Sequence, residues 1–282
     1  MTDTDVEFDA LIRLLDDPSE TVKQAVQARL NELGPSVLPR LRQAQTKAAE
    51  PLRSHIAQTA NHFHVASIEQ AWTALLARPE PDLERGVFLL ALYQYPDLDI
   101  AYYRARLDEF TAQIRPRIER AWGYERAEIL SEFMCERLGF IGNHEEYYDP
   151  DNSYINQVIN RRTGIPISLS VVYMLLAQRL ALPVYGVNMP AHFVVKYQDE
   201  DQEVFLDVFN GGVPFTREAG VRSLIKVGIT PQPQHFRAAT TREILLRMVR
   251  NLVIIARDAG QEQAYADLRR LLAPWDENEA DG

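Results

Sequence analysis

Apolar residues three or four positions apart recur through the first 140 residues of the chain, and this spacing predicts helices. Gly34 followed by Pro35 predicts a helix end, because glycine adopts the left-handed C-terminal conformation and proline cannot continue a helix. Three short stretches near the start have one apolar face each: Phe8, Leu11, Ile12 and Leu15; then Val22, Val26, Leu30 and Leu33; then Val37, Leu38 and Leu41.

The segment from Asp17 to Glu20 predicts where the second of these helices begins. Asp17 would be the N-cap, Pro18 the first helical residue, and Glu20 the residue that closes a capping box. The resulting helix–turn–helix pattern resembles one HEAT-type repeat. We therefore expect a HEAT-like helical segment over residues 1–75.

Helical patterns continue to about residue 140 and then give way to turns. The clearest stripe alternates gaps of three and four residues: Ile100, Tyr103, Leu107, Phe110 and Ile114. The segment "GNHEEYYDPDNSY" is rich in turn residues. The run "IPISLSVVYMLLAQRLAL" after it is apolar almost all round, so it predicts a helix that is buried on every side.

Three β-like runs follow the apolar helix: "VYGVNM", "HFVVKY" and "VFLDVF". The polar segment "QDEDQE" between the last two predicts an antiparallel hairpin, and "NGGVPF" predicts a turn. Two final helices with Gly260 between them are similar to the second half of a tetratricopeptide repeat. We therefore expect an α+β core over residues 76–235, including its leading helices, and a tetratricopeptide-like hairpin over residues 236–282.

The composition narrows the classes of function. A formal net charge of −10 disfavours nucleic-acid binding, because an acidic protein repels the phosphate backbone. No apolar run reaches the roughly 18 residues of a membrane span, and the acidic first residues lack the apolar core of a signal peptide. The single cysteine, Cys135, cannot form an intrachain disulfide. We expect a cytoplasmic protein without membrane or nucleic-acid partners, and the sequence leaves its oligomeric state open.

The sequence contains no strong metal or cofactor motif. His62 and His64 are two residues apart, which suits different sides of a helix, and no nearby cysteine or glutamate completes a ligand set. Gly211 and Gly212 fit a turn better than a phosphate-binding loop. We predict no metal site and no cofactor.

His192 is the residue with the clearest potential chemistry, because it interrupts the otherwise strand-like run "NMPAHFVVKY". One hairpin register pairs Tyr197 with Val204. It makes His192 face Phe209 and leaves Asp207 as the diagonal neighbour of His192. A slip of two residues would set His192 opposite Asp207. Both registers place the two side chains on one side of the sheet, where a carboxylate can orient an imidazole as in a nucleophilic triad.

Three spaced blocks of the second half carry a family pattern: "YYDPDNSYINQVINRRTGIPISLSVVYMLLAQRL", "GVNMPAHFVVKY" and "FLDVFNGG". Together they resemble the transglutaminase-like core of the SirB type, from about residue 140 to 215. The leading helices and the tetratricopeptide-like end also fit that architecture, whereas residues 1–75 lie outside it. The resemblance implies a transglutaminase/papain-like core, with the buried helix packed on a small antiparallel sheet.

Enzymes of this type use a Cys-His-Asp triad with the cysteine at the start of the buried helix. The resemblance carries the other two roles onto His192 and Asp207, and it places the nucleophile within residues 166–168, where only Ser168 has a nucleophilic atom. A serine hydroxyl is far from ionisation at neutral pH, so it would need His192 as a full general base and an oxyanion hole. Ser168 also fits a helix cap.

Other positions depart from the family pattern or have simpler explanations. Ala191 stands where the pattern usually has glycine before the histidine, and Val208 stands where it usually has proline. Asn152 fits either an orienting partner of the histidine or a turn in "DPDNSY". Cys135 lies outside the matched blocks and fits an ordinary buried thiol.

A histidine and an aspartate without the cysteine favour a non-catalytic, transglutaminase-like module that binds a peptide or protein partner. The alternative is an amide or peptide hydrolase with a Ser168-His192-Asp207 triad. A third hypothesis is a scaffold built from the HEAT-like and tetratricopeptide-like surfaces. The predicted site combines the triad-equivalent positions with three binding residues: Ser168, His192 and Asp207, then Asn152, Tyr148 and Asn210.

Overall fold

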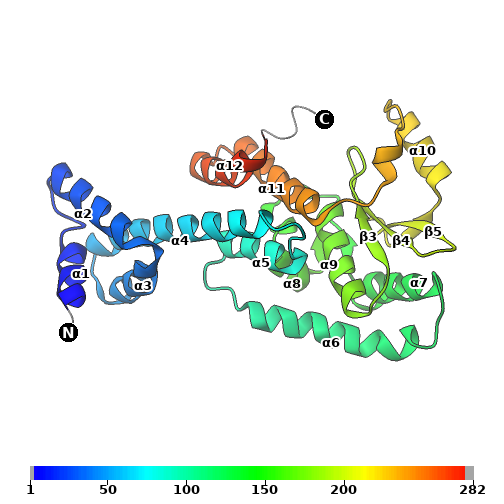
Figure 1. The fold of residues 1–282 in the computed structure, drawn as a ribbon, viewed down its shortest axis with the longest axis horizontal. Helices are drawn as coiled ribbons and strands as arrows, with labels where there is room; N and C mark the ends of the chain where they lie inside the picture. The colour runs from blue at the N-terminus through cyan, green and yellow to red at the C-terminus, as the bar shows by residue number, and fades with distance from the viewer. Residues whose placement is uncertain (1–2, 277–282) are drawn as a thin grey trace. The chain divides into compact units, whose positions relative to one another are not determined.

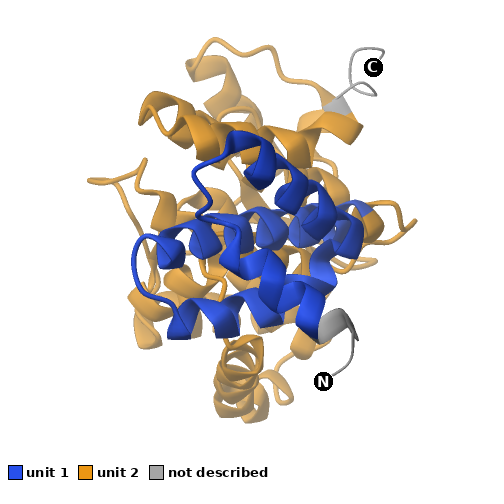
Figure 2. Ribbon diagram, turned by 90° about the vertical axis from the view of Figure 1, so that its left-hand side faces the viewer, with its two compact units in different colours: residues 1–73 blue, residues 74–282 orange. Residues whose placement is uncertain are grey.

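A computed structural model describes residues 3–276 of the chain, which divides into two compact units, residues 1–73 and 74–282 (Figure 2). The first unit is helical, and its apolar stripes meet in one core around Leu30, Leu41 and Ile56. Its elements are α1 (Asp3–Arg13), α2 (Glu20–Leu33), the 3-10 helix η1 (Gly34–Val37), α3 (Leu38–Lys47) and α4 (Leu52–Leu76), whose last three residues belong to the second unit (Figure 1).

Helix α2 begins two residues later than the sequence predicted. Its N-cap is Ser19, whose backbone N–H donates to Asp17 Oδ1 at 2.8 Å. The Asp17 side chain therefore closes a turn ahead of the helix, as aspartate often does with the backbone two residues on. The expected capping box between Asp17 and Glu20 does not form.

The second unit opens with helices that cover a mixed core. The predicted stripe of α6 is buried from Tyr103 to Ile114. The elements that precede the sheet are α5 (Leu83–Gln94), α6 (Ile100–Ile118), α7 (Glu125–Glu132), the π-helical turn η2 (Phe133–Arg137), the 3-10 turn η3 (Pro150–Asn152) and α8 (Ile155–Arg161), with a short parallel pair formed by β1 (Ile141–Gly142) and β2 (Thr163–Gly164).

Helix α9 (Pro166–Arg179) is the helix that the sequence predicted to be buried on every side. Its side chains are buried without a break from Pro166 to Tyr173 and again from Leu175 to Ala177. Beside it lies a four-stranded antiparallel sheet in the order β3 (Val184–Val187), β4 (Val194–Gln198), β5 (Glu203–Asp207) and β6 (Val213–Phe215) (Figure 1). The chain therefore has the predicted buried helix on a small antiparallel sheet.

Both faces of this sheet are covered. Gly186 in β3 lies against α9, since a Cβ atom there would be 3.1 Å from the Met174 sulfur. On the opposite face, Phe205 packs with Leu224 and Phe236. These two residues come from α10 (Arg217–Lys226) and the 3-10 turn η4 (Pro233–Phe236). A sheet buried on both sides holds the ends of its strands at fixed positions.

The hairpin register is the first of the two predicted registers, because Tyr197 pairs with Val204. Two details differ from the expectation. His192 is not in a strand: β4 starts at Val194, and His192 closes a turn in which its backbone N–H donates to Met189 O at 3.2 Å. Ala191 in that turn has a φ of 58°, a left-handed conformation that glycine adopts more readily.

The segment predicted as a turn, "NGGVPF", supplies a fourth strand. Gly211 and Gly212 have φ values of 83° and 73°, and the N–H of Gly212 donates to Asp207 O at 2.7 Å. This tight turn reverses the chain directly, so that Val213 pairs with Asp207. The turn prediction was therefore right for the glycines and wrong for residues 213–215.

Two helices close the described chain: α11 (Thr241–Asp258) and α12 (Glu262–Asp276). Gly260 between them has a φ of 66°. Asp267 of α12 is almost fully buried and accepts hydrogen bonds from Gln263 and from Tyr93 of α5, so α12 is tied to the core. Within residues 3–276, none of the helices combines the length and apolar character needed to cross a bilayer.

The buried hydroxyl of Tyr173 gives a test of how α9 is held. It donates to Ala127 O at 2.7 Å and accepts from Ser131 Oγ at 3.3 Å. Tyr173→Phe leaves that carbonyl without its donor, so we expect the free energy of unfolding to fall by about 1–3 kcal/mol. Urea unfolding followed by circular dichroism measures the change. Tyr185→Phe is the control: its ring is largely exposed, and we expect a change within about 0.5 kcal/mol. Equal losses in the two variants would contradict the assignment.

Candidate functional site

His192 and Asp207 form a hydrogen-bonded pair at the end of the sheet. His192 Nε2 lies 2.9 Å from Asp207 Oδ2, and both side chains are partly exposed, at 29% and 19%. His192 ends the turn before β4 and Asp207 is the last residue of β5, so the hairpin register brings them together. Two of the three residues predicted to form a triad are therefore in contact.

Asn210 holds the carboxylate from the other side. Its backbone N–H donates to Asp207 Oδ1 at 3.2 Å, and its side-chain amide donates to Asp207 Oδ2 at 2.8 Å. Burial acts to raise the pKa of Asp207, but the hydrogen bond and charge of His192, together with the Asn210 bonds, hold that pKa below its ordinary value. Asp207 is therefore an ionised acceptor with a fixed orientation.

Ser168, the third residue of the predicted triad, is engaged elsewhere. Its side chain is fully buried near the start of α9. Its hydroxyl donates to Asn152 O at 2.5 Å and accepts from the backbone N–H of Ile165 at 3.1 Å. Among the described residues it has no hydrogen bond to His192 or Asp207. Ser168 satisfies the helix start, as in the capping interpretation.

The helix start and the histidine are linked through Phe209. Gly164 lies close against Ser168, because a Cβ atom on Gly164 would be 2.6 Å from Ser168 Oγ. Gly164 is also the partner of Gly142 in the β1–β2 pair. A Cβ atom on Gly142 would lie 2.6 Å from Phe209 O. The ring centroid of Phe209 is 6.3 Å from that of His192. The predicted contact of His192 with Phe209 is confirmed, and Phe209 lies on the path of contacts from Ser168 to His192.

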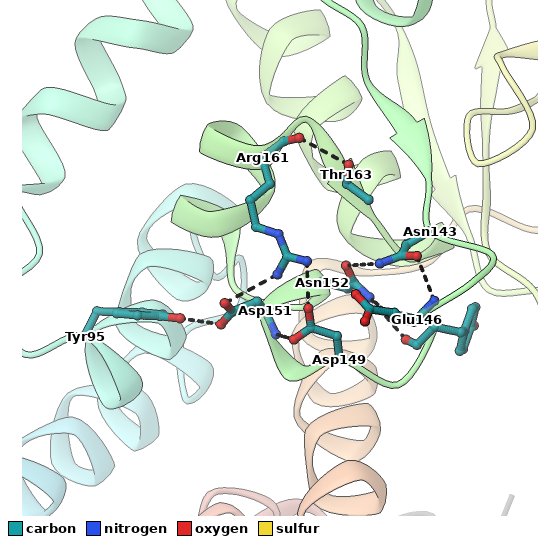
Figure 3. A network of polar contacts seen from close by, with 9 residues as sticks. Tyr95, Asn143, Glu146, Asp149, Asp151, Asn152, Arg161 and Thr163 are labelled. Carbon is teal, nitrogen blue, oxygen red and sulfur yellow. Dashed lines mark hydrogen bonds and ion pairs between the residues drawn. The ribbon is translucent and has the colours of Figure 1, made fainter.

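The loop before α8 is fixed by a charged network (Figure 3). Arg161 Nη2 lies 2.7 Å from Asp149 Oδ2, and Arg161 Nη1 lies 3.4 Å from Asp151 Oδ2. The hydroxyl of Tyr95, the residue directly after helix α5, donates to Asp151. Because the carboxylates of Asp149 and Asp151 are both bound to the Arg161 guanidinium, the turn that leads into Asn152 has little conformational freedom.

Asn152, predicted to bind a ligand, is inside this loop instead. It is fully buried. Its Oδ1 accepts from Asn143 Nδ2 at 3.2 Å, and its Nδ2 donates to Glu146 O at 2.7 Å (Figure 3). Its backbone carbonyl accepts the Ser168 hydroxyl. Asn152 therefore supports the turn, which is the simpler of its two interpretations.

The surface beside the His–Asp pair is aromatic. The rings of His144, Tyr147 and His192 surround that of Phe209, with centroid distances of 4.5, 6.1 and 6.3 Å. We call these four residues the Phe209 cluster. Tyr148, a predicted binding residue, is 69% exposed and lies edge-on to Tyr147 at 5.3 Å. Asn210 is exposed as well. Exposed tyrosines next to polar donors are typical of a binding surface.

The environment of Cys135 does not activate its thiol. Its sulfur is near the Asp207 turn, at 3.6 Å from where a Cβ atom on Gly212 would be. Burial, and to a smaller extent the charge of Glu136, raises the pKa of Cys135 to about 11. A thiol with this pKa is protonated at neutral pH, and the thiolate is the nucleophilic form.

Sequence reasoning missed Arg247 of α11 as a residue of this site. Its Nη1 donates to Met189 O at 3.0 Å, in the turn that carries His192. The available signal was an arginine at the edge of the apolar face of "EILLRMVRNL". Residues 3–276 contain no group of three or more His, Cys, Asp or Glu side chains arranged to hold a metal ion.

The chain matches the core of the Transglutaminase-like superfamily over residues 101–250, a span that contains Ser168, His192, Asp207 and Arg247. It is 38% identical over 173 residues to a UPF0162 protein of Xylella fastidiosa (strain 9a5c), which is 58% of this chain and 61% of that protein. This chain therefore covers less than two thirds of the length of that relative.

Two further relatives share the same region. A UPF0162 protein of Pseudomonas aeruginosa is 31% identical over 207 residues, covering 72% of this chain and 76% of that protein. F-box only protein 21 of Mus musculus is 33% identical over 147 residues, covering 50% of this chain and 23% of that protein.

Two serines of α9 provide a matched test of the Ser168 contacts. Both are fully buried, but Ser168 Oγ is hydrogen-bonded and Ser170 Oγ has no partner among the described residues. We expect Ser168→Ala to lower the free energy of unfolding by about 1–3 kcal/mol, because Asn152 O and Ile165 N–H lose their partner. Ser170→Ala should be neutral or stabilising, since it removes an unsatisfied hydroxyl. Urea denaturation compares them, and a Ser168→Ala variant as stable as wild type would refute the capping role.

The Asp207 pKa gives a second test. Because it lies below the ordinary 3.8, the ionised carboxylate stabilises the fold above that pH, and this contribution is lost as the pH falls through the lowered pKa. His192→Phe keeps a ring but removes the donor, while burial remains, so the pKa of Asp207 should rise. A ¹³C carboxyl NMR titration measures it. We expect a cost of about 1–3 kcal/mol near neutral pH that shrinks below about pH 4. An unchanged Asp207 titration would be inconsistent with this pairing.

Proposed function

Because the chain belongs to the Transglutaminase-like superfamily, we propose that it is a non-catalytic module of that fold that binds an extended peptide segment of a partner protein beside His192 and Asp207. One observation carries this proposal. The hydroxyl at the triad-equivalent helix start, Ser168, is buried and donates its proton to Asn152 O, whereas the His–Asp pair is intact and partly exposed. Acyl transfer needs a nucleophile within hydrogen-bond reach of its base.

The surroundings of the pair support a peptide ligand. Tyr147 and Tyr148 present partly exposed rings, and aromatic side chains contribute much of the energy of peptide and protein contacts. Asn188 and Asn210 are exposed amides close to His192 and Asp207, and they can exchange hydrogen bonds with a peptide backbone. This combination of rings and amides suits an extended chain.

The proposal extends to the flanks. We assign the core to the SirB type, over residues 76–235 with its leading helices. The helices of residues 1–75 are HEAT-like and those of residues 236–282 are tetratricopeptide-like, and both act as contact surfaces for a protein partner in the cytoplasm. The helix–turn–helix order in each segment supports this assignment.

The alternative function is an amide or peptide hydrolase that uses Ser168, His192 and Asp207. It is favoured by the 2.9 Å His–Asp pair, which is the base half of a triad. It requires Ser168 to leave its bond to Asn152 O and reach His192. The two functions therefore differ in whether Ser168 reacts.

Peptide binding and serine reactivity together test the proposal. We expect N-acetylated tetrapeptides, screened as a synthetic library, to shift the NMR signals of His192, Tyr147 and Asn210. Tyr147→Ala should weaken binding at least about tenfold, because it removes an aromatic contact. The control Tyr102→Ala removes an exposed tyrosine from α6 and should leave affinity unchanged.

A fluorophosphonate probe separates the alternative. We expect no labelling of Ser168 in the wild-type protein. Labelling of Ser168 that disappears in His192→Ala would establish the hydrolase instead. A library in which no peptide perturbs the His192 region would reject the binding module.

A further inference from the structure

Arg247 and His192 are joined through one carbonyl group. Arg247 Nη1 donates to Met189 O at 3.0 Å, and the backbone N–H of His192 donates to the same oxygen at 3.2 Å. Arg247 also donates to the side-chain oxygen of Asn188. One edge of the guanidinium is therefore occupied by the turn that presents His192.

The other edge of the guanidinium is unoccupied by protein acceptors. Nε and Nη2 of Arg247 have no hydrogen-bond partner among the described residues, and neither atom is fully buried. Nε and Nη2 lie on one side of the planar group, and this edge can donate two parallel hydrogen bonds.

Arg247 also lacks a carboxylate partner within residues 3–276. By comparison, Arg161 pairs with Asp149 and Arg179 pairs with Glu84. Burial lowers the pKa of Arg247, and Tyr147 opposes this effect. A partly desolvated cation without a counter-ion is costly, and a bound anion would relieve that cost.

The neighbouring groups favour a single negative charge. Tyr147 is close enough for its charge to act on the pKa of Arg247, and it belongs to the Phe209 cluster with His192. Arg247 itself is bonded to the turn that carries His192. Asp207, an ionised carboxylate, is bonded to His192 and would repel a dianion such as phosphate. A guanidinium edge with two donors matches the two oxygens of a carboxylate.

We infer that the open edge of Arg247 binds a carboxylate of the peptide ligand, and that this contact selects acidic ligands. The inference rests on the proposed function, because it names the ligand chemistry of the same surface. The carboxylate is either the C-terminus of the peptide or an Asp or Glu side chain. Arg247 is thus a specificity residue whose inner edge positions the His192 turn.

Matched peptide libraries test the inference on the full-length protein. N-acetylated tetrapeptides are prepared with a free C-terminal carboxylate or as carboxamides, and each set is made with glutamate or glutamine at the internal positions. We expect wild-type protein to bind the acid at least about tenfold more tightly than the matched amide, as measured by calorimetry. The terminal and side-chain pairs show which carboxylate is recognised.

Two variants on helix α11 complete the design. Arg247→Gln keeps a donor for Met189 O but removes the charge and the two-donor edge. We therefore expect this variant to bind the acid and the matched amide with about equal affinity. Arg257→Gln removes an exposed arginine that pairs with Asp258, and it should leave the preference unchanged. The ratio of acid to amide affinity measured on the wild-type protein tests the inference even if a variant does not fold.

The outcomes are distinct. Equal affinity of wild type for acids and amides, with shifts at His192, would overturn the carboxylate site and leave the binding module standing. An Arg247→Gln variant that weakens acids and amides equally would show that Arg247 only positions the turn, and it would also overturn the inference. If neither library binds, both proposals fail.

Discussion

A helix without an exposed face must have the polar groups at its N-terminus satisfied inside the protein. Helix α9 is such a helix, and Ser168 meets this requirement by accepting from Ile165 N–H and donating to Asn152 O. The same atom would have to be the nucleophile in a serine hydrolase. A cysteine thiol is a weak donor and acceptor, so a sulfur at this position would be less bound to the backbone and freer to react. The hydrogen-bonding capacity of oxygen thus gives Ser168 a structural role at the helix start.

The loop that receives the Ser168 proton is itself held rigidly. Asn152 is fixed by Asn143 and Glu146, and the preceding turn is fixed by the ion pairs of Arg161. Asn152 O is therefore a well-placed acceptor rather than a mobile one. Releasing the Ser168 hydroxyl would require this network to move or a buried carbonyl to remain unpaired, and each unpaired buried group costs about 1–3 kcal/mol.

In the second unit, residues 74–282, two sites of buried charge differ in whether the protein itself supplies the partner of opposite charge. On the α10 face of the sheet, Lys196 and Arg217 both bind Glu203, so that network is complete within the protein. On the His192 side, Arg247 has only uncharged acceptors among the described residues. A complete network stabilises one packing arrangement, whereas an incomplete one leaves electrostatic attraction available for a ligand. The position of Arg247 beside His192, and not its burial alone, makes it part of the candidate site.

The sequence by itself determined most of the helices, the buried character of α9 and the shared side of His192 and Asp207 on the sheet, because periodicity and a short polar turn are local features. The choice between the two possible hairpin registers came from the structure, which pairs Tyr197 with Val204. The sequence also did not determine the strand β6 or the turn at His192, since these depend on the backbone geometry at Gly212 and Ala191. The environment of Ser168 and the role of Arg247 were decided only by the tertiary structure. Their partners, Asn152 and Met189, are 16 and 58 residues away in the chain. Such contacts arise when separate elements pack, and no local pattern of residues specifies which donor will meet which acceptor.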